Sequence, residues 1–171
     1  MRYYTTLPIA LLLAGCSSPE PTTESHIAGK AYRAQKELQG AIVAGVNYPA
    51  YGALVQQLSA EILILRDTAR GTNDAAIADH YATALAIYMD AGRVWSQKIE
   101  DAGGQYAKIT PKGRLLSHGQ TAEVSQRYGI PVIDVRNDYG SLVPTISEDA
   151  IPQLWKRARL AAAKGDSLLL R

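Results

Sequence analysis

The sequence contains no phenylalanine and only one cysteine among its 171 residues. One cysteine cannot form an intramolecular disulfide, and it cannot supply a cysteine cluster for a metal ion. Because phenylalanine is absent, the aromatic residues are ten tyrosines and two tryptophans, all of which carry a polar group. Such rings usually lie at the margin of a core or at a wet interface.

Charge and motif content limit the function classes. Charged residues make up 20% of the chain and nearly cancel, leaving a formal net charge of +2, and no basic run suits a nucleic acid. The GxSxG, GxxxxGKS or GxxxxGKT, and GxGxxG motifs are absent. The three histidines, His26, His80 and His118, form no HExxH pair. We therefore expect a non-enzymatic protein with no catalytic residue and no metal site. Convergence of His80, Asp79 or Asp90 with another acid in one cleft would instead indicate an enzyme.

The N-terminal segment "LPIALLLAG", residues 7–15, is apolar and follows a positive start at Met1 and Arg2. It is shorter than the roughly 20 apolar residues that a membrane-spanning helix needs. A short charged start, an apolar core and a small-residue exit are typical of a secretory signal peptide. We therefore expect residues 1–15 to be a signal peptide and the protein to be exported.

The tetrapeptide Leu13-Ala14-Gly15-Cys16 resembles the lipobox of bacterial lipoproteins. The resemblance implies cleavage before Cys16 and a covalent diacylglycerol on its thiol, with no other cofactor. Each buried CH₂ contributes about 0.8 kcal/mol, so two or more acyl chains hold a protein at a bilayer. The serine that follows the cysteine, Ser17, resembles the residue at this position in outer-membrane lipoproteins that face the periplasm, if the cell is Gram-negative. The alternatives are a secreted protein with an incidental cysteine and a cytosolic protein with an apolar first strand.

The remaining chain divides into a tether and one helical domain. Residues 17–24 consist of two each of serine, proline, glutamate and threonine, which cannot bury an apolar face. We expect residues 16–24 to be a lipidated, flexible tether and residues 25–171 to be an all-α, antiparallel bundle of four to five helices. An irregular extended segment is expected before the last helix. The overall layout resembles small helical lipoproteins of unknown function.

Helical periodicity supports this fold class. Apolar residues recur at steps of three and four in several segments, which predict helices over residues 26–45, 51–65, 77–99, 120–128 and 145–166, with Gly129 just beyond the end of the fourth. The segment "AEILILRD" is apolar on more than one face, so the second helix is expected to be the most buried. Residues 105–118 have no clear period and are expected to form a loop. "IPVIDV", residues 130–135, is expected to be a packed extended loop, because Pro131 disfavours a strand and no partner strand is evident.

Two sets of side chains are candidate binding residues. Tyr81, Tyr88 and Trp95 recur at intervals of seven along the third helix, which favours core packing or a groove for a sugar, a peptide or a partner helix. On the last helix, Lys156, Arg157 and Arg159 either contact anionic lipid headgroups or form an ordinary polar face.

These features predict a membrane-anchored cell-envelope lipoprotein with a structural or adaptor role. Its expected partners are the lipid bilayer, through the acyl anchor on Cys16, and an envelope protein complex. The alternative is a lipoprotein that binds a small sugar or peptide in a groove lined by Tyr and Trp.

Overall fold

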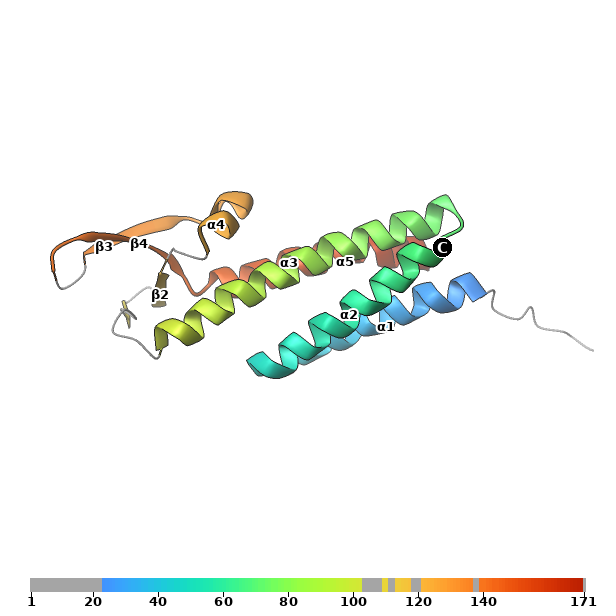
Figure 1. Cartoon of the computed structure of the whole chain (residues 1–171), viewed down its shortest axis with the longest axis horizontal. Coiled ribbons are helices and arrows are strands. Elements are labelled where there is room, and N and C mark those ends of the chain that lie inside the picture. The colour runs from blue at the N-terminus through green and yellow to red at the C-terminus, as the bar shows by residue number, and fades with distance from the viewer. Residues whose placement is uncertain (1–22, 103–108, 111–112, 118–120, 137–138, 171) are drawn as a thin grey trace, which may run out of the picture.

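The computed structural model describes residues 23–102, 109–110, 113–117, 121–136 and 139–170. Within them, the helices are α1 (Thr23–Ala44), α2 (Tyr48–Thr68), α3 (Thr72–Ala102), α4 (Ala122–Tyr128) and α5 (Ala150–Leu169), and the strands are β1 (Ile109–Thr110), β2 (Gly113–Ser117), β3 (Val132–Arg136) and β4 (Leu142–Ser147). The four long helices run back and forth in an antiparallel bundle (Figure 1). The predicted all-α bundle is therefore confirmed, with a small sheet at one end.

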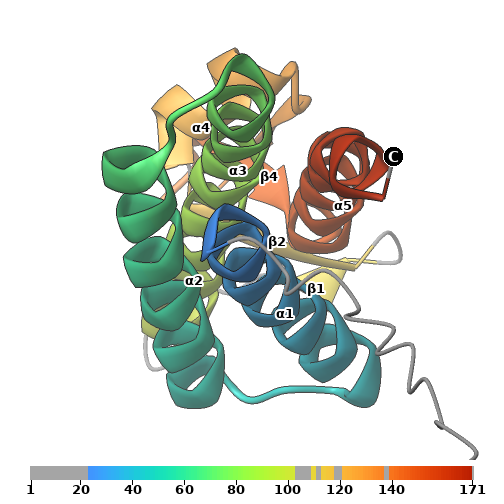
Figure 2. The same ribbon diagram turned by 90° about the vertical axis from the view of Figure 1, so that its right-hand side faces the viewer.

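The long helices form a four-cornered bundle in which α1 and α3 lie at opposite corners, with α2 and α5 between them (Figure 2). The most extensive contact is between α3 and α5. Both of these helices bury small residues, which allows their backbones to approach closely: Ala84, Ala91, Ala158, Ala162 and Gly165. Because α3 also packs against α2, it is the central helix of the bundle.

The prediction that the second helix is the most buried is wrong. On α2 only one stripe is buried, and it contains Tyr51, Leu58, Ile62 and Leu65. The intervening Leu63 and Ile64 are 58% and 47% exposed, because a helix with 3.6 residues per turn turns them away from the bundle. The apolar run therefore leaves a patch on the surface.

Local signals explain several helix boundaries. Gly45 adopts a positive φ of 89° after α1, and the Asn47 side chain accepts a hydrogen bond from the Ala50 N–H at 3.0 Å. This cap, with Pro49 in the first turn, starts α2 as an N-cap should. Gly129 ends α4 in the left-handed conformation, as the sequence predicts. At the other end, α1 begins at Thr23, inside the segment that we expected to be tether.

The expectation of a loop and an unpaired extended segment between α3 and α5 is wrong. The described strands form an antiparallel sheet in the order β1-β2-β4-β3, and β1 and β2 occupy part of the expected loop. The missing partner of "IPVIDV" is β4, which contains Pro144. The pairing of β4 with β2 ends at Thr145. Pro144 therefore lies beyond it, and its missing N–H removes no described bond of that ladder.

The two strands β3 and β4 form a hairpin that projects beyond the helices at the end of the bundle opposite the start of α1 (Figure 1). We call the described part of this hairpin, residues 132–136 and 139–147, the arm. Among the described helices, none has the combined length and apolar character to span a membrane.

Candidate functional site

The end of the bundle that carries the arm also carries a cluster of four aromatic side chains. Trp95 of α3 contacts Trp155 of α5, with ring centroids 5.6 Å apart. Tyr51 of α2 packs against both indoles, with its ring centroid 5.5 Å from that of Trp95 and 5.9 Å from that of Trp155. Tyr48 packs edge-on against Trp95 at 5.6 Å. The cluster joins three helices, because the start of α2, the end of α3 and the start of α5 meet in the antiparallel bundle.

Hydrogen bonds fix the inner side of this cluster. The Trp155 Nε1–H donates to the Tyr51 hydroxyl at 3.3 Å, and that hydroxyl donates to the backbone carbonyl of Tyr88 at 2.7 Å. Tyr51 is only 2% exposed, and burial raises the pKa of its phenol well above the ordinary value. The indole of Trp155 is therefore held in one orientation by a neutral hydroxyl.

The two indoles line a cleft of about 270 Å³. Its other lining residues come from the end of α3, the turn between β4 and α5, and the start of α5: Lys98, Glu148, Asp149, Ile151 and Pro152. Lys98 Nζ and Glu148 Oε2 are 2.9 Å apart, and both side chains are partly exposed. Ligand pockets commonly measure about 300–1,000 Å³, so this cleft suits a single ring or one side chain rather than a large molecule.

The structure does not gather the predicted stripe of Tyr81, Tyr88 and Trp95 into one open groove. Tyr81 and Tyr88 are fully buried, and only Trp95 lines the cleft. The Tyr81 hydroxyl donates to Asp166 Oδ1 at 2.9 Å, and the Tyr88 hydroxyl accepts from Gln35 Nε2 at 3.3 Å. Burial raises the pKa of both phenols, and the Asp166 carboxylate raises that of Tyr81 further. Tyr81 and Tyr88 are therefore core residues and do not line an open groove.

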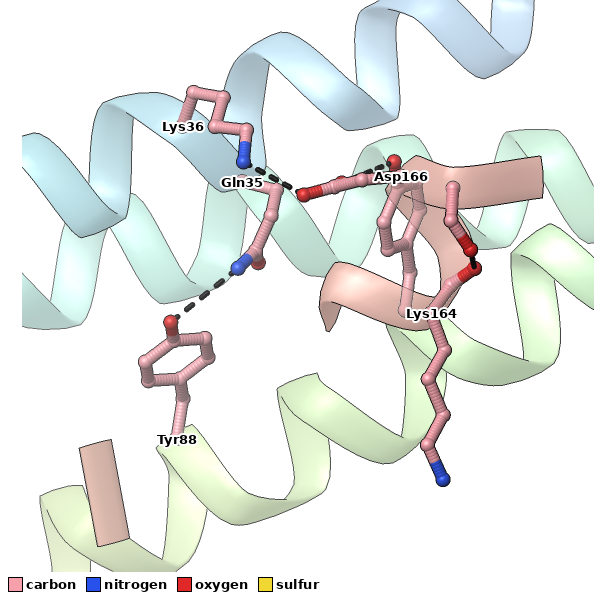
Figure 3. Close-up of polar contacts among 7 residues, drawn as sticks. Gln35, Lys36, Tyr88, Lys164 and Asp166 are labelled. Carbon is pink, nitrogen blue, oxygen red and sulfur yellow. Dashed lines mark hydrogen bonds and ion pairs between the residues drawn. The ribbon is translucent and has the colours of Figure 1, made fainter. Parts of the chain in front are cut away.

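A polar network crosses the bundle beside them. Figure 3 shows Lys36 and Gln35 of α1 reaching toward Asp166 of α5 and Tyr88 of α3. Lys36 Nζ lies 2.6 Å from Asp166 Oδ2. Gln35 is fully buried, and its Oε1 has no hydrogen-bond partner among the described residues. The carboxylate of Asp166 therefore links α1 and α3 to α5.

A buried carboxylate on α3 fastens α4 to the bundle. Asp90 of α3 is 2% exposed and accepts hydrogen bonds from Arg93 at 3.0 Å, Arg127 at 2.6 Å and the Tyr128 hydroxyl at 2.9 Å. The Asp90 carboxylate raises the pKa of the Arg127 guanidinium, and burial followed by the bond to Asp90 raises that of Tyr128. The arrangement is that of a structural ion-pair network.

The acidic residues that would have indicated an enzyme lie apart. Asp79 pairs with Arg66 of α2 at 2.9 Å on the surface, and His80 contributes its Cβ to the packing around Gly165. Asp90 instead belongs to the α4 network. Among the described residues, no group of three or more His, Cys, Asp or Glu side chains is placed to hold a metal ion.

The three cations proposed for lipid contact are exposed on α5. Because α5 starts beside the arm, Lys156, Arg157 and Arg159 follow within its first half, away from the end where α1 begins (Figure 1). The Arg157 guanidinium lies 5.8 Å from the ring centroid of Tyr128, a cation–π contact with α4. Cys16, the proposed lipidation site, lies outside the described residues.

The sequence did not reveal the arm as a candidate site. Its apolar side chains reach solvent on both faces: Val132 is 45%, Ile133 38%, Tyr139 90% and Leu142 60% exposed. The available signal was the pair of apolar runs on either side of Gly140, which adopts a positive φ of 79° in the turn. Exposed apolar side chains that gather on one element mark interaction surfaces.

Comparison with known proteins assigns no family: no protein-family model, curated protein or solved structure matches this chain.

Proposed function

We propose that this protein is a membrane-anchored cell-envelope lipoprotein that acts as a non-enzymatic adaptor, with the arm as its protein-binding element. The proposal combines the lipobox-like sequence ending at Cys16 with the position of the arm. The single observation that carries it is that an apolar, exposed hairpin projects from the end of the bundle opposite the start of α1 (Figure 1).

This arrangement suits an adaptor because the anchored end and the binding end are separate. The helix α3 has 31 residues and is therefore about 46 Å long at 1.5 Å per residue. A chain held at the bilayer near Thr23 would carry the arm roughly this far from its point of attachment. The arm would meet partners in the envelope space rather than the headgroups beneath the bundle.

The apolar content of the arm explains why it would bind protein. Four apolar side chains of the arm are exposed to solvent: Val132, Ile133, Tyr139 and Leu142. A hairpin in water is only marginally stable unless its apolar surface packs against something, so a partner that covers these side chains would also stabilise the arm. A partner that covers these side chains would gain about 25 cal/mol for each Å² removed from water.

Site-specific photo-crosslinking in living cells tests the proposal. A photo-crosslinking amino acid is placed at Tyr139 or at Leu142, and the matched control is Lys30, an exposed residue of α1 near the other end of the bundle. We expect a discrete protein adduct from both arm positions and none from Lys30. The absence of an adduct at either arm position would remove the adaptor role.

The anchor is tested separately by mass spectrometry of the membrane fraction. The native chain should begin at Cys16 and carry the mass of its acyl chains, and the Cys16→Ser variant should carry no lipid. A native chain that begins at Met1 without lipid would refute the lipid anchor. The protein-binding role of the arm would then depend on the crosslinking result alone.

A second candidate function is small-ligand binding in the cleft, and the observation that favours it is that Trp95 and Trp155 both line it. Flat indole surfaces beside the Lys98–Glu148 ion pair would suit one sugar ring or one peptide side chain. The chain contains two tryptophans, so its tryptophan emission reports on this cleft alone.

Fluorescence titration with monosaccharides and short peptides tests this candidate. We expect a saturable emission change that is weakened in Lys98→Ala and unchanged in Lys30→Ala, which alters a distant exposed lysine. Emission that stays constant across both ligand classes would exclude the cleft as their binding site.

A further inference from the structure

The outer edge of the arm is an open strand edge. In the sheet order β1-β2-β4-β3, strand β3 is last, and no strand among the described residues pairs with its other side. Four of its five residues are exposed and Val135 is partly buried. Proteins usually protect such an edge, because its unpaired N–H and C=O groups can accept another strand.

The strand register shows which backbone groups face this edge. Asp134 lies opposite Pro144, which has no N–H to donate, so these two residues form a pair without ladder bonds. The next pair, Ile133 with Thr145, then forms the bonds, and the Thr145 hydroxyl also donates to the Ile133 carbonyl at 2.6 Å. Because ladder bonds alternate, the N–H and C=O groups of residues 132, 134 and 136 point to the open edge.

The charges on the same edge favour one particular partner. Asp134 and Arg136 have opposite signs and are two residues apart, so both lie on one face of the strand. A charge on an edge strand commonly blocks pairing. In this sequence, however, two antiparallel copies of β3 centred on Val135 would place each Asp134 directly opposite the Arg136 of the other copy.

The other symmetric registers are disfavoured. A symmetric pairing must place edge-facing residues opposite edge-facing residues, which restricts its centre. Centring on Asp134 would oppose two carboxylates, and centring on Arg136 would oppose two guanidinium groups; like charges directly opposite destabilise a strand pair. Centring on Ile133 would place Asp134 opposite Val132 and leave both charges without an opposite charge. The sequence of β3 therefore selects the register centred on Val135.

We propose that a second copy of this chain binds the open edge of β3, in an antiparallel pairing centred on Val135. The pairing joins the two arms into one continuous sheet and is stabilised by two Asp134–Arg136 pairs between the copies. Arg136 already donates to the Gly140 carbonyl at 2.9 Å, and a guanidinium has further N–H groups for a carboxylate. The inference goes beyond the adaptor role and requires no lipid.

Charge reversal tests the pairing on the full chain with Cys16→Ser, which removes the lipid and the native thiol. Analytical ultracentrifugation in mild detergent measures the dimer dissociation constant of this parent and of Asp134→Arg and Arg136→Asp. Each single variant opposes two like charges across the edge, so we expect its dissociation constant to rise by about tenfold or more. The double variant, Asp134→Arg with Arg136→Asp, should dimerise as the parent does.

Mixing the two single variants is the sharpest form of the test. The Asp134→Arg chain has two cations on its edge and the Arg136→Asp chain has two anions, so a heterodimer regains both opposite-charge pairs. At a concentration near the parent's dissociation constant, we expect each variant alone to stay mostly monomeric and an equimolar mixture to dimerise. A loss of folding could not produce this rescue.

Disulfide trapping tests the register. Val135 of each copy would face its counterpart in a pair without ladder bonds, with Cα atoms about 4.5 Å apart, within the range that a disulfide spans. Val135→Cys should therefore form a covalent dimer under mild oxidation. The control is Val143→Cys, which lies opposite Val135 on β4, one strand away from the edge.

Several results would overturn the proposal. A parent chain that stays monomeric, a dimer that ignores both charge reversals, or equal crosslinking of the two cysteine variants would each exclude pairing through β3. These outcomes leave the adaptor role intact, because that role is measured by adducts to other proteins in cells.

Discussion

Gly165 is the position where the packing of α5 against α3 can be tested most directly. A Cβ built on Gly165 would lie 2.9 Å from Cε1 and 3.1 Å from Cδ1 of Tyr81, and 3.4 Å from the Cβ of His80. The Tyr81 ring has little freedom to move, because it is fully buried and its hydroxyl is bonded to Asp166. We therefore expect Gly165→Ala to destabilise the fold.

Two opposing effects set the magnitude. Alanine is better than glycine inside a helix by about 1 kcal/mol. Adding a methyl group to a close-packed interface costs about 1–3 kcal/mol, because side chains or backbone must shift. The contact below 3.0 Å with a rigid ring places this site toward the upper part of that range. We expect a net loss of about 1–2 kcal/mol, which lowers the melting temperature by roughly 2–8 °C for a chain of this size.

Denaturant unfolding of matched glycine variants isolates the contact. Gly52 in α2 has no atom within 4 Å of the position that a Cβ would take, so Gly52→Ala should gain about 0.5–1 kcal/mol from helix propensity alone. Gly92→Ala should lie between the two, because its nearest contact is Tyr51 Cε1 at an ordinary 3.5 Å. If Gly165→Ala is as stabilising as Gly52→Ala, the close approach of α3 and α5 is refuted.

Three further measurements examine the cap, the α4 network and the buried phenols. Asn47→Ala should lower the free energy of unfolding by about 1 kcal/mol, because the Ala50 N–H loses its acceptor; an unchanged denaturation midpoint would contradict the cap. Asp90→Asn should increase hydrogen exchange of α4 about tenfold while α3 and α5 stay protected, because the carboxylate that holds Arg127 and Tyr128 is lost. If α4 in the variant stays as protected as α3 and α5, the role of Asp90 in holding α4 is contradicted. Four phenols have folded-state pKa values above the unfolded value of 10.0: Tyr51, Tyr81, Tyr88 and Tyr128. The stability that they contribute is therefore present below pH 10.0 and is lost as the pH rises beyond it. Phenolate absorbance should show these four tyrosines titrating at higher pH than the others, and a single ordinary titration of all tyrosines would refute the prediction.

Local sequence signals were sufficient for the helices. The break "GVNYP" contains a glycine with positive φ, a capping asparagine and a proline in the first turn, and each acts within a few residues of its own position. The same holds for Gly129 at the end of α4. Such signals are readable because the hydrogen bonds that they control are local.

The sheet could not be predicted in this way because its pairings are distant in sequence. Leu116 of β2 pairs with Ile146 of β4 across a whole helix and a second strand. Pro131 argued against a strand at "IPVIDV", and the register shows that Pro144, in the partner strand β4, faces a place where no described ladder bond is needed. A strand becomes recognisable when its partner is known.

Of the two tryptophans that line the cleft, the sequence indicated only Trp95 as a binding candidate, and the reason is geometrical. The spacing of seven suggested that Tyr81, Tyr88 and Trp95 share one face, but a straight helix drifts by about 20° per heptad. Over two heptads Trp95 has turned by about 40° from Tyr81, from the core to its margin. Its partner Trp155 comes from α5, 60 positions later in the chain, and no local pattern connects the two.

The anchoring of the arm explains how a surface hairpin can be a precise binding element. Along β4 the exposed fraction falls from 60% at Leu142 to 0% at Ile146, so the tip is open and the base is part of the core. The chain then passes through Glu148, whose carboxylate pairs with Lys98 of α3 at 2.9 Å, directly into α5. The direction of the arm is therefore set by the bundle before any partner binds. Binding at its tip or along the β3 edge then orders few additional residues, and less of the interaction energy is lost to conformational entropy than for a free peptide.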